Sequence, residues 1–265
     1  LRMTMAASES QGRDVKFDEK RVEGYRNFAT KLWNAVRFAQ AQGVTASDGE
    51  RPTAAHAVNR WILAECDAMV RDATAALEAY RYDQYAQTLY QFAWSRFCDW
   101  YVELAKPLLA EGSPDRQETQ KVAAYVLDRI LICLHPAMPF ITEELWHALG
   151  ERPNDLIVAQ WPETPAAAEN DAAREIGWLI ELITAIRSAR SALNVPPSAR
   201  LALHAADGDA AMLARLEAHR PALERIARIE SLHLGPPPAG GSAQLVVEGA
   251  GFALPLAGVI DLEAE

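Results

Sequence analysis

The chain has 265 residues, half of them hydrophobic, which is enough for one large or two modest domains with a sizeable core. Charges interrupt every apolar run before about 18 residues, which argues against a membrane-spanning helix, and three widely separated cysteines argue against a disulfide framework and favour a cytoplasmic setting. A net charge of −10 argues against a nucleic-acid partner unless the basic residues are segregated.

The first strong pattern predicts a helix over residues 21–42. Tyr25, Phe28 and Leu32 begin an apolar stripe at helical spacing, and Gly43 follows as a stop signal. The other face carries two lines of amides, cations and rings: Asn27, Lys31, Asn34 and Phe38, and beside them Arg26, Thr30, Trp33 and Arg37. Such groups hydrogen-bond base edges, hold phosphates and stack on unpaired bases.

The charge around this helix is locally reversed. Between Arg13 and Phe38 there are seven Lys and Arg residues and four Asp and Glu residues, a local charge of +3. This segregation fits an RNA-facing patch on an acidic protein. We expect Trp33 to pack against a neighbouring helix.

Three further helices are predicted before Gly150, over residues 54–80, 82–109 and 115–135, after a polar break at 43–53. Asp99 lies in the aromatic-rich helix over 82–109, where we expect it to cap a helix or to pair with a cation inside the bundle. Pro136 and Pro139 then force a corner, and we expect Thr142 to cap the next helix.

After Gly150 the composition shifts to proline and small residues, which predicts a small domain of sheet plus helices. Strands are expected at 156–162, 199–205, 227–235, 243–249 and 251–258. Helices are expected at 172–193 and 209–226, with a loop at 235–242 and the start of another helix at 259–265.

No catalytic pattern is present in the sequence. It has no glycine-rich phosphate loop, no GxSxG and no HExxH. Cys133 and His135 lack a second pair with ligand spacing, so we expect no metal site.

Four blocks resemble the anticodon-binding region of valyl-tRNA synthetases: GRDVKFDEKRVEGYRNFATKLWNAVRFA (12–39), FAWSRFCDWYVELAKPLL (92–109), HPAMPFITEELWHAL (135–149) and IRSARSALNVPP (186–197). The third block also occurs in isoleucine and leucine synthetases, whereas the first two point to the valine branch. The usual family run RAEMNVPP is altered here by Ser191 and Ala192, so no role of its glutamate carries over.

The resemblance implies a mainly α fold: residues 1–14 as the remnant of a linker from a catalytic domain, 15–150 as a helical-bundle anticodon-binding domain, and 151–265 as a small α/β domain ending at the start of a helical arm. The family's ATP signatures are absent. ATP and Mg²⁺ would serve the parent enzyme, while this chain would bind no cofactor, no metal, no DNA and no membrane, and would be monomeric.

The implied partner is the anticodon stem-loop of a valine tRNA, whose anticodon ends in A and C because valine codons are GUN. The candidate RNA-binding residues are Arg26, Asn27, Lys31, Asn34, Arg37, Phe38, Arg187 and Arg190. Two alternatives stay open: the same domain of an isoleucine or leucine synthetase, and a helical protein–protein scaffold without RNA function.

Overall fold

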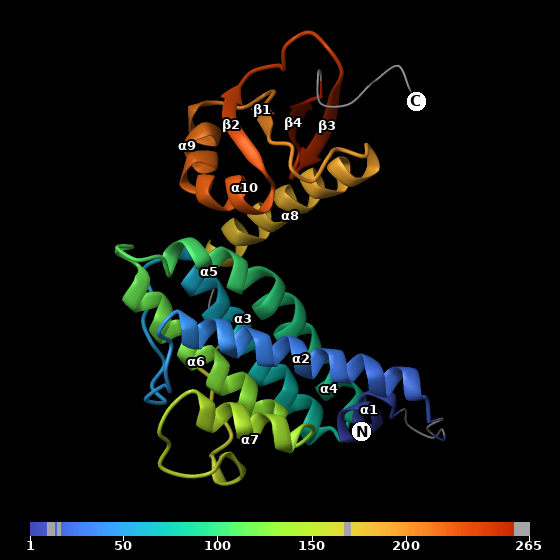
Figure 1. Cartoon of the computed structure of the whole chain (residues 1–265), viewed down its shortest axis with the longest axis vertical. Helices are drawn as coiled ribbons and strands as arrows, with labels where there is room; N and C mark the ends of the chain where they lie inside the picture. Colours follow the sequence, from blue (N-terminus) through green and yellow to red (C-terminus); the bar gives the residue numbers. More distant parts are fainter. Residues whose placement is uncertain (10–13, 15–16, 167–170, 257–265) are drawn as a thin grey trace. The chain divides into compact units, whose positions relative to one another are not determined.

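Helices fill the first part of the chain and a small sheet with helices fills the second (Figure 1). The computed structural model describes residues 1–9, 14, 17–166 and 171–256. The chain divides into two units, residues 1–173 and 174–265, which we call unit 1 and unit 2. The mainly α fold with a small α/β part, expected from the sequence, is confirmed.

The helices of unit 1 follow one another along the chain, and the connection between α2 and α3 spans residues 42–56. They are α1 (Arg2–Ser8), α2 (Glu19–Ala41), α3 (Ala57–Glu78), α4 (Tyr82–Gln91), the π-helix η1 (Phe92–Tyr101), α5 (Val102–Leu108), α6 (Arg116–Leu134), α7 (Pro139–Ala148) and the short 3₁₀ helix η2 (Leu156–Val158). The predicted helices over 54–80 and 115–135 are confirmed as α3 and α6.

The predicted helix over 21–42 is confirmed as α2. The Asp18 carboxylate accepts a hydrogen bond from the Lys20 backbone N–H at 2.9 Å and caps the first turn. Phe28, Leu32 and other members of the apolar stripe are buried. At the end, Gly43 has a φ of +80°, a left-handed conformation that glycine adopts without steric cost.

The predicted helix over 82–109 is continuous, but its middle ten residues form η1 rather than an α-helix. A π segment widens the helix locally and often occurs at functional sites. η1 packs against α2, α3 and α5.

A partly buried polar network anchors the start of α3. The Glu118 carboxylate, in the first turn of α6, accepts hydrogen bonds from the Ala55 and His56 N–H groups and from the Asn59 amide, at 2.7, 3.0 and 2.8 Å. The Tyr101 hydroxyl donates to the Asn59 side-chain oxygen at 3.1 Å. Burial by itself raises the pKa of Glu118, but these hydrogen bonds outweigh it and hold the pKa below its ordinary value.

Replacing Glu118 with alanine should therefore cost about 1.5–3 kcal/mol of unfolding free energy at pH 7, the range for hydrogen bonds to a charged group. Because the folded-state pKa is depressed, this contribution is fully present above the ordinary value of about 4.3 and is lost as the pH falls through the folded pKa. Urea unfolding at pH 7 and near pH 3 would measure it, with the exposed Glu111→Ala variant as the control. A cost that persists unchanged at pH 3 would contradict the assignment.

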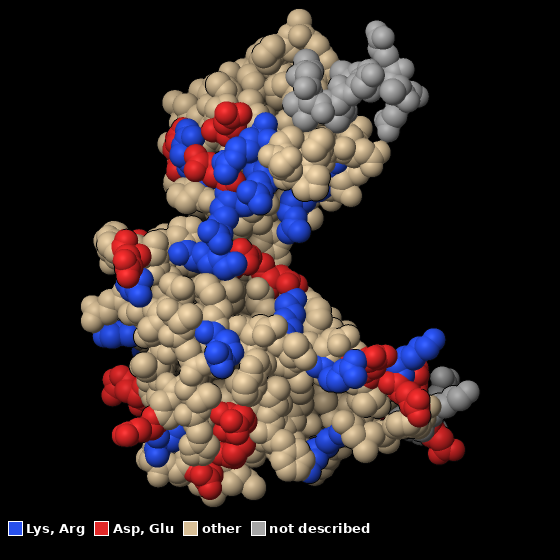
Figure 2. All heavy atoms as spheres, viewed as in Figure 1, with Lys and Arg blue, Asp and Glu red and all other residues tan. Residues whose placement is uncertain are grey.

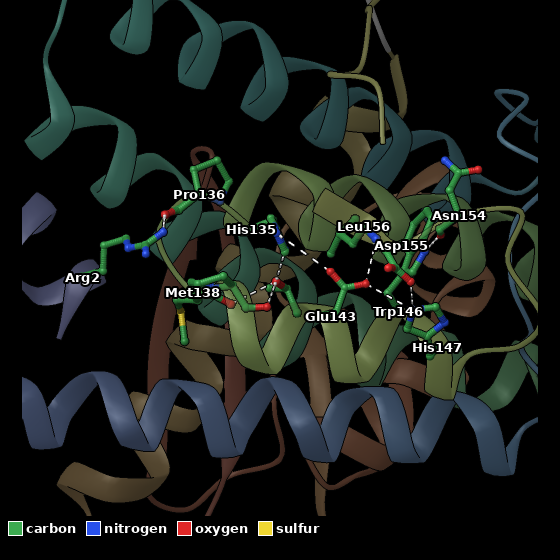
Figure 3. Close-up of polar contacts among 12 residues, drawn as sticks. Arg2, His135, Pro136, Met138, Glu143, Trp146, His147, Asn154, Asp155 and Leu156 are labelled. Atoms are coloured by element: carbon green, nitrogen blue, oxygen red, sulfur yellow. Dashed lines mark hydrogen bonds and ion pairs between the residues drawn. The ribbon is translucent and has the colours of Figure 1, made fainter. Parts of the chain in front are cut away.

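The proline corner between α6 and α7 is held by side chains (Figure 3). Thr142 does not cap α7, contrary to expectation, because the helix already begins at Pro139, which needs no N–H partner at its first position. Instead the buried Thr142 hydroxyl donates to the Met138 carbonyl at 3.0 Å and lies 2.9 Å from His135 Nδ1. The Arg2 guanidinium of α1 donates to the Pro136 carbonyl at 3.0 Å.

The strand expected at 156–162 is wrong, since this segment holds only η2 and extended loop. Of its apolar run, Leu156 is buried, while Ile157 and Val158 are 72% and 64% exposed. The Trp161 indole N–H donates to the Thr74 hydroxyl at 2.8 Å, which ties the segment to α3. The division between the units accordingly falls after Ala173 rather than after Gly150.

Residues 1–14 were expected to be a linker remnant. Their described part forms α1, which buries Met3 and packs against α4 and α2.

Unit 2 has a four-stranded sheet in the order β2-β1-β4-β3, with β1 and β2 parallel and the other pairs antiparallel. Its elements are α8 (Asp171–Ala192), β1 (Leu201–Ala205), α9 (Ala210–Ala218), α10 (Arg220–Ile226), β2 (Ile229–Leu234), β3 (Ser242–Val247) and β4 (Ala250–Pro255). Four of the five predicted strands are thus confirmed. The predicted helix over 209–226 is divided into α9 and α10, which pack against β2.

Two turn features of unit 2 follow from local chemistry. Glu248 and Gly249 both have positive φ, which closes the two-residue β3–β4 hairpin. Asp209 caps α9 by accepting from the Met212 N–H at 2.9 Å. The helix expected at 259–265 lies outside the described residues.

Candidate nucleic-acid interface

The outward side of α2 carries six of the eight predicted RNA-binding residues. Arg26, Asn27, Asn34 and Arg37 are exposed, and Lys31 and Phe38 are half-buried. Figure 2 shows the surface over α2 as largely uncharged, with separate basic side chains and with acidic ones near its N-terminal end. An uncharged surface with spaced cations suits bases and phosphates together better than it suits duplex phosphates alone.

Lys31 is the most constrained of these residues. Its ammonium group forms an ion pair with the Asp99 carboxylate and lies 3.8 Å from the centre of the Trp94 ring. Both partners come from η1, so the π segment places a ring and a carboxylate beside α2. The expectation that Asp99 pairs with a cation is confirmed, but its side chain is 47% exposed, so the pair lies at the surface and not inside the bundle.

An aromatic cluster surrounds the Trp94 ring that Lys31 contacts. The Tyr90 and Trp94 rings stack with centroids 5.5 Å apart, and Phe28 and Tyr25 of α2 contact Tyr90 at 5.0 and 5.8 Å. We did not single out Trp94 from the sequence, because its helix is aromatic on most sides. Its place beside Lys31 depends on a contact between segments about sixty residues apart.

The other candidate residues of α2 differ in whether their side chains have partners. Arg26 pairs with Glu23 at 2.8 Å, an exposed contact within one helix. Phe38 has the Lys106 ammonium 5.5 Å from its ring centre. Within the described part of the chain, the Arg37, Asn27 and Asn34 side chains have no hydrogen-bond partner.

Trp33 remains 36% exposed, more than packing against a neighbouring helix predicts. Its ring lies on the same side of α2 as Arg26 and Arg37 by helical spacing, so it adds a partly exposed aromatic surface to the candidate interface.

The structure separates the two arginines predicted on α8. Arg187 is exposed. Arg190 is only 8% exposed, and its Nη2 donates to the carbonyls of Pro196 and Ala199 at 3.1 and 2.8 Å. A direct contact of Arg190 with a base is therefore not supported, because the guanidinium faces the loop after α8.

One group of side chains among the described residues has donor atoms close enough for a metal ion: Glu143 and His147 of α7, and Asp155 (Figure 3). His147 Nε2 lies 3.2 Å from a carboxylate oxygen of each acid, and Glu143 also accepts from the Leu156 N–H at 2.7 Å. These bonds join α7 to the following loop. We interpret the group as a surface ion-pair network.

Among the described residues, no helix is long and apolar enough to cross a membrane.

Comparison with known proteins defines the class. Residues 59–205 match the profile of the anticodon-binding domain of tRNA ligases, and the chain belongs to this family. The match spans α3 to β1, and α2 precedes it.

Several similar proteins are valine–tRNA ligases. The chain is 57% identical to the valine–tRNA ligase of Rhizorhabdus wittichii, 53% identical to that of Zymomonas mobilis and 46% identical to that of Sphingopyxis alaskensis, in each case over its whole length. It spans about 30% of the length of these relatives.

Proposed function

We propose that this chain binds the anticodon stem-loop of a valine tRNA as a part of a valine–tRNA ligase. The observation that carries the proposal is the face of α2, where Lys31 is held between Trp94 and Asp99 amid exposed amides and cations, in a chain of the anticodon-binding family. The parent enzyme would attach valine to the tRNA with ATP and Mg²⁺ in the cytoplasm, as a monomer. We assign no part of this reaction to residues of this chain.

The residues of the face divide by the chemistry that they can offer. Phe38 supplies a ring for stacking an unpaired base. Asn27 and Asn34 can hydrogen-bond base edges, while Arg26, Lys31 and Arg37 can hold phosphates or base edges. Arg187 of α8, in unit 2, offers the same chemistry as these cations. Each stacked base and each bidentate base contact contributes about 1–3 kcal/mol. Two such contacts are enough to distinguish the A and C that end a valine anticodon from other bases.

The two alternatives weaken on different grounds. The relatives of the chain are named as valine–tRNA ligases, which favours the valine branch over isoleucine or leucine. A scaffold without RNA function does not account for membership of the anticodon-binding family.

The test is titration of the chain with a valine tRNA transcript and with one whose middle anticodon base is changed, at two salt concentrations. The base change should weaken binding by about tenfold or more, the loss of one bidentate or stacking contact. Higher salt should weaken the binding of both RNAs, because phosphate contacts release counterions. Equal binding of both transcripts, or no binding at low salt, would contradict the proposal.

A further inference from the structure

Three arginines of unit 2, Arg190, Arg200 and Arg228, lie near the beginning of the two parallel strands, and Arg187 lies one turn away on α8. Arg200 immediately precedes β1 and Arg228 immediately precedes β2. Leu201 pairs with Ile229, and the Leu201 N–H donates to the Arg228 carbonyl at 3.1 Å, so the two arginines are neighbours at the same end of the paired strands β1 and β2. Both are exposed.

Arg190 reaches the same place from α8. Its Nη2 donates to the carbonyl of Ala199, the residue before Arg200. Its Nη1 is buried and has no hydrogen-bond partner among the described residues. Arg187 lies one turn earlier on α8, where it is exposed.

This arrangement is electrostatically unfavourable as it stands. Burial lowers the pKa of Arg190, and the positive charge of Arg228 lowers it further. A buried guanidinium normally has a carboxylate partner and all its N–H groups bonded. Among the described residues, none of the four arginines forms an ion pair with a carboxylate.

Two other arginines of the same unit show the usual arrangement. Arg215 pairs with Glu175 at 2.8 Å, and Arg220 pairs with Glu217 and Glu224 at 2.5 and 3.3 Å. Unit 2 has no lysine, so every basic side chain that Figure 2 shows gathered over α8 and α10 is an arginine. Arg215 and Arg220 thus have the acidic partners that Arg187, Arg190, Arg200 and Arg228 lack among the described residues.

We propose that Arg187, Arg190, Arg200 and Arg228 form an anion site that binds a phosphate of an RNA backbone. A phosphate offers several acceptor oxygens to several guanidinium groups at once, and it would satisfy the free Nη1 of Arg190. The assignment to RNA rests on the proposed function, because the chain would then bind a tRNA. The site positions the RNA and reads no base.

The first test uses Arg200→Gln/Arg228→Gln, with Arg220→Gln as a control that removes a half-buried, paired arginine from the same unit. The affinity for the valine tRNA transcript is measured at three salt concentrations. The double variant should bind about tenfold more weakly at low salt, and the slope of log affinity against log salt should fall by about 0.9 for the one lost phosphate contact. The loss should be equal for the cognate and the anticodon-changed transcripts, and Arg220→Gln should change the affinity less than twofold.

The second test needs no RNA. Inorganic phosphate, added in place of chloride at constant ionic strength, should raise the unfolding temperature of the unchanged chain and of Arg220→Gln, because a ligand that binds only the folded state stabilises it. It should not raise that of the double variant. If the double variant does not fold in chloride, Arg187→Gln on the exposed side of α8 replaces it in both tests.

The outcomes separate this site from the proposed function. Equal phosphate responses in all variants would overturn the anion site. A phosphate response that depends on the cluster, without an effect on RNA affinity, would overturn its assignment to RNA. If the unchanged chain binds the cognate and the anticodon-changed transcripts equally, the proposed function is rejected. The response to inorganic phosphate would still support the anion site.

Discussion

Replacing Arg152 with methionine should lower the free energy of unfolding by about 3–5 kcal/mol, because it leaves a buried carboxylate without its partner. Arg152 Nη1 and Nη2 donate to the two carboxylate oxygens of Asp128 at 2.7 and 2.6 Å, and the two side chains are only 2% and 5% exposed. The guanidinium also lies 3.6 Å from the centre of the Trp146 ring, and its Nε donates to the Trp146 carbonyl at 3.0 Å. The pair thus fastens α7 and the following loop to α6.

Urea unfolding measures this loss, with Arg81→Met as the control. Arg81 pairs with Asp83 at the surface, where solvent screens the charges, so its removal should have little effect. The double variant Arg152→Met/Asp128→Leu should recover most of the stability, because an apolar pair of similar volume avoids the cost of removing two charges from water. Additive losses in the double variant would refute this explanation.

The pH dependence of Arg152→Met offers a second check. Burial raises the pKa of Asp128 even with Arg152 in place. Without the arginine, ionisation of the buried Asp128 carboxylate lowers the free energy of unfolding. Because the folded-state pKa is raised, this loss begins above the ordinary pKa of the group and grows as the pH rises. The stability deficit of the variant should therefore be larger at pH 8 than at pH 5.

Replacing Phe38 with alanine should weaken binding of the valine tRNA by about 1–3 kcal/mol, which is the contribution of one base stacked on an aromatic ring. Phe38 is half-buried near the end of α2, with Lys106 on one side of its ring. The remaining surface of the ring is where an unpaired base can stack. The measurement is the dissociation constant at fixed salt, beside the unfolding temperature, which shows whether the helix end stays intact.

Phe140→Ala is the matched control, because this ring is 90% exposed on α7 and its loss removes the same side chain from another surface. It should change the affinity less than twofold. Phe38→Trp should keep most of the binding, since a larger ring still stacks. If Phe38→Ala and Phe140→Ala behave alike, Phe38 does not contact a base.

The sequence determined by itself where most helices and strands form. The stripe that includes Phe28 and Leu32 predicts α2 because helical periodicity is local: each residue needs only neighbours three or four positions away. The alternation in LALHA and the turn chemistry of Asp209 predict β1 and the start of α9 for the same reason. The quoted blocks also pointed to the anticodon-binding family to which the chain belongs.

The tertiary structure alone decided which of these side chains meet. Lys31 and Asp99 are 68 positions apart, and only the packing of η1 against α2 joins them. Residues 156–162 have a strand-like composition, but no neighbouring strand bonds them, so they form a loop fastened by Trp161. Arg190 looks like a surface cation in its helix, yet the loop that returns to β1 covers it. Burial and long-range pairing depend on how distant segments pack together, which the spacing of residues along the chain does not specify.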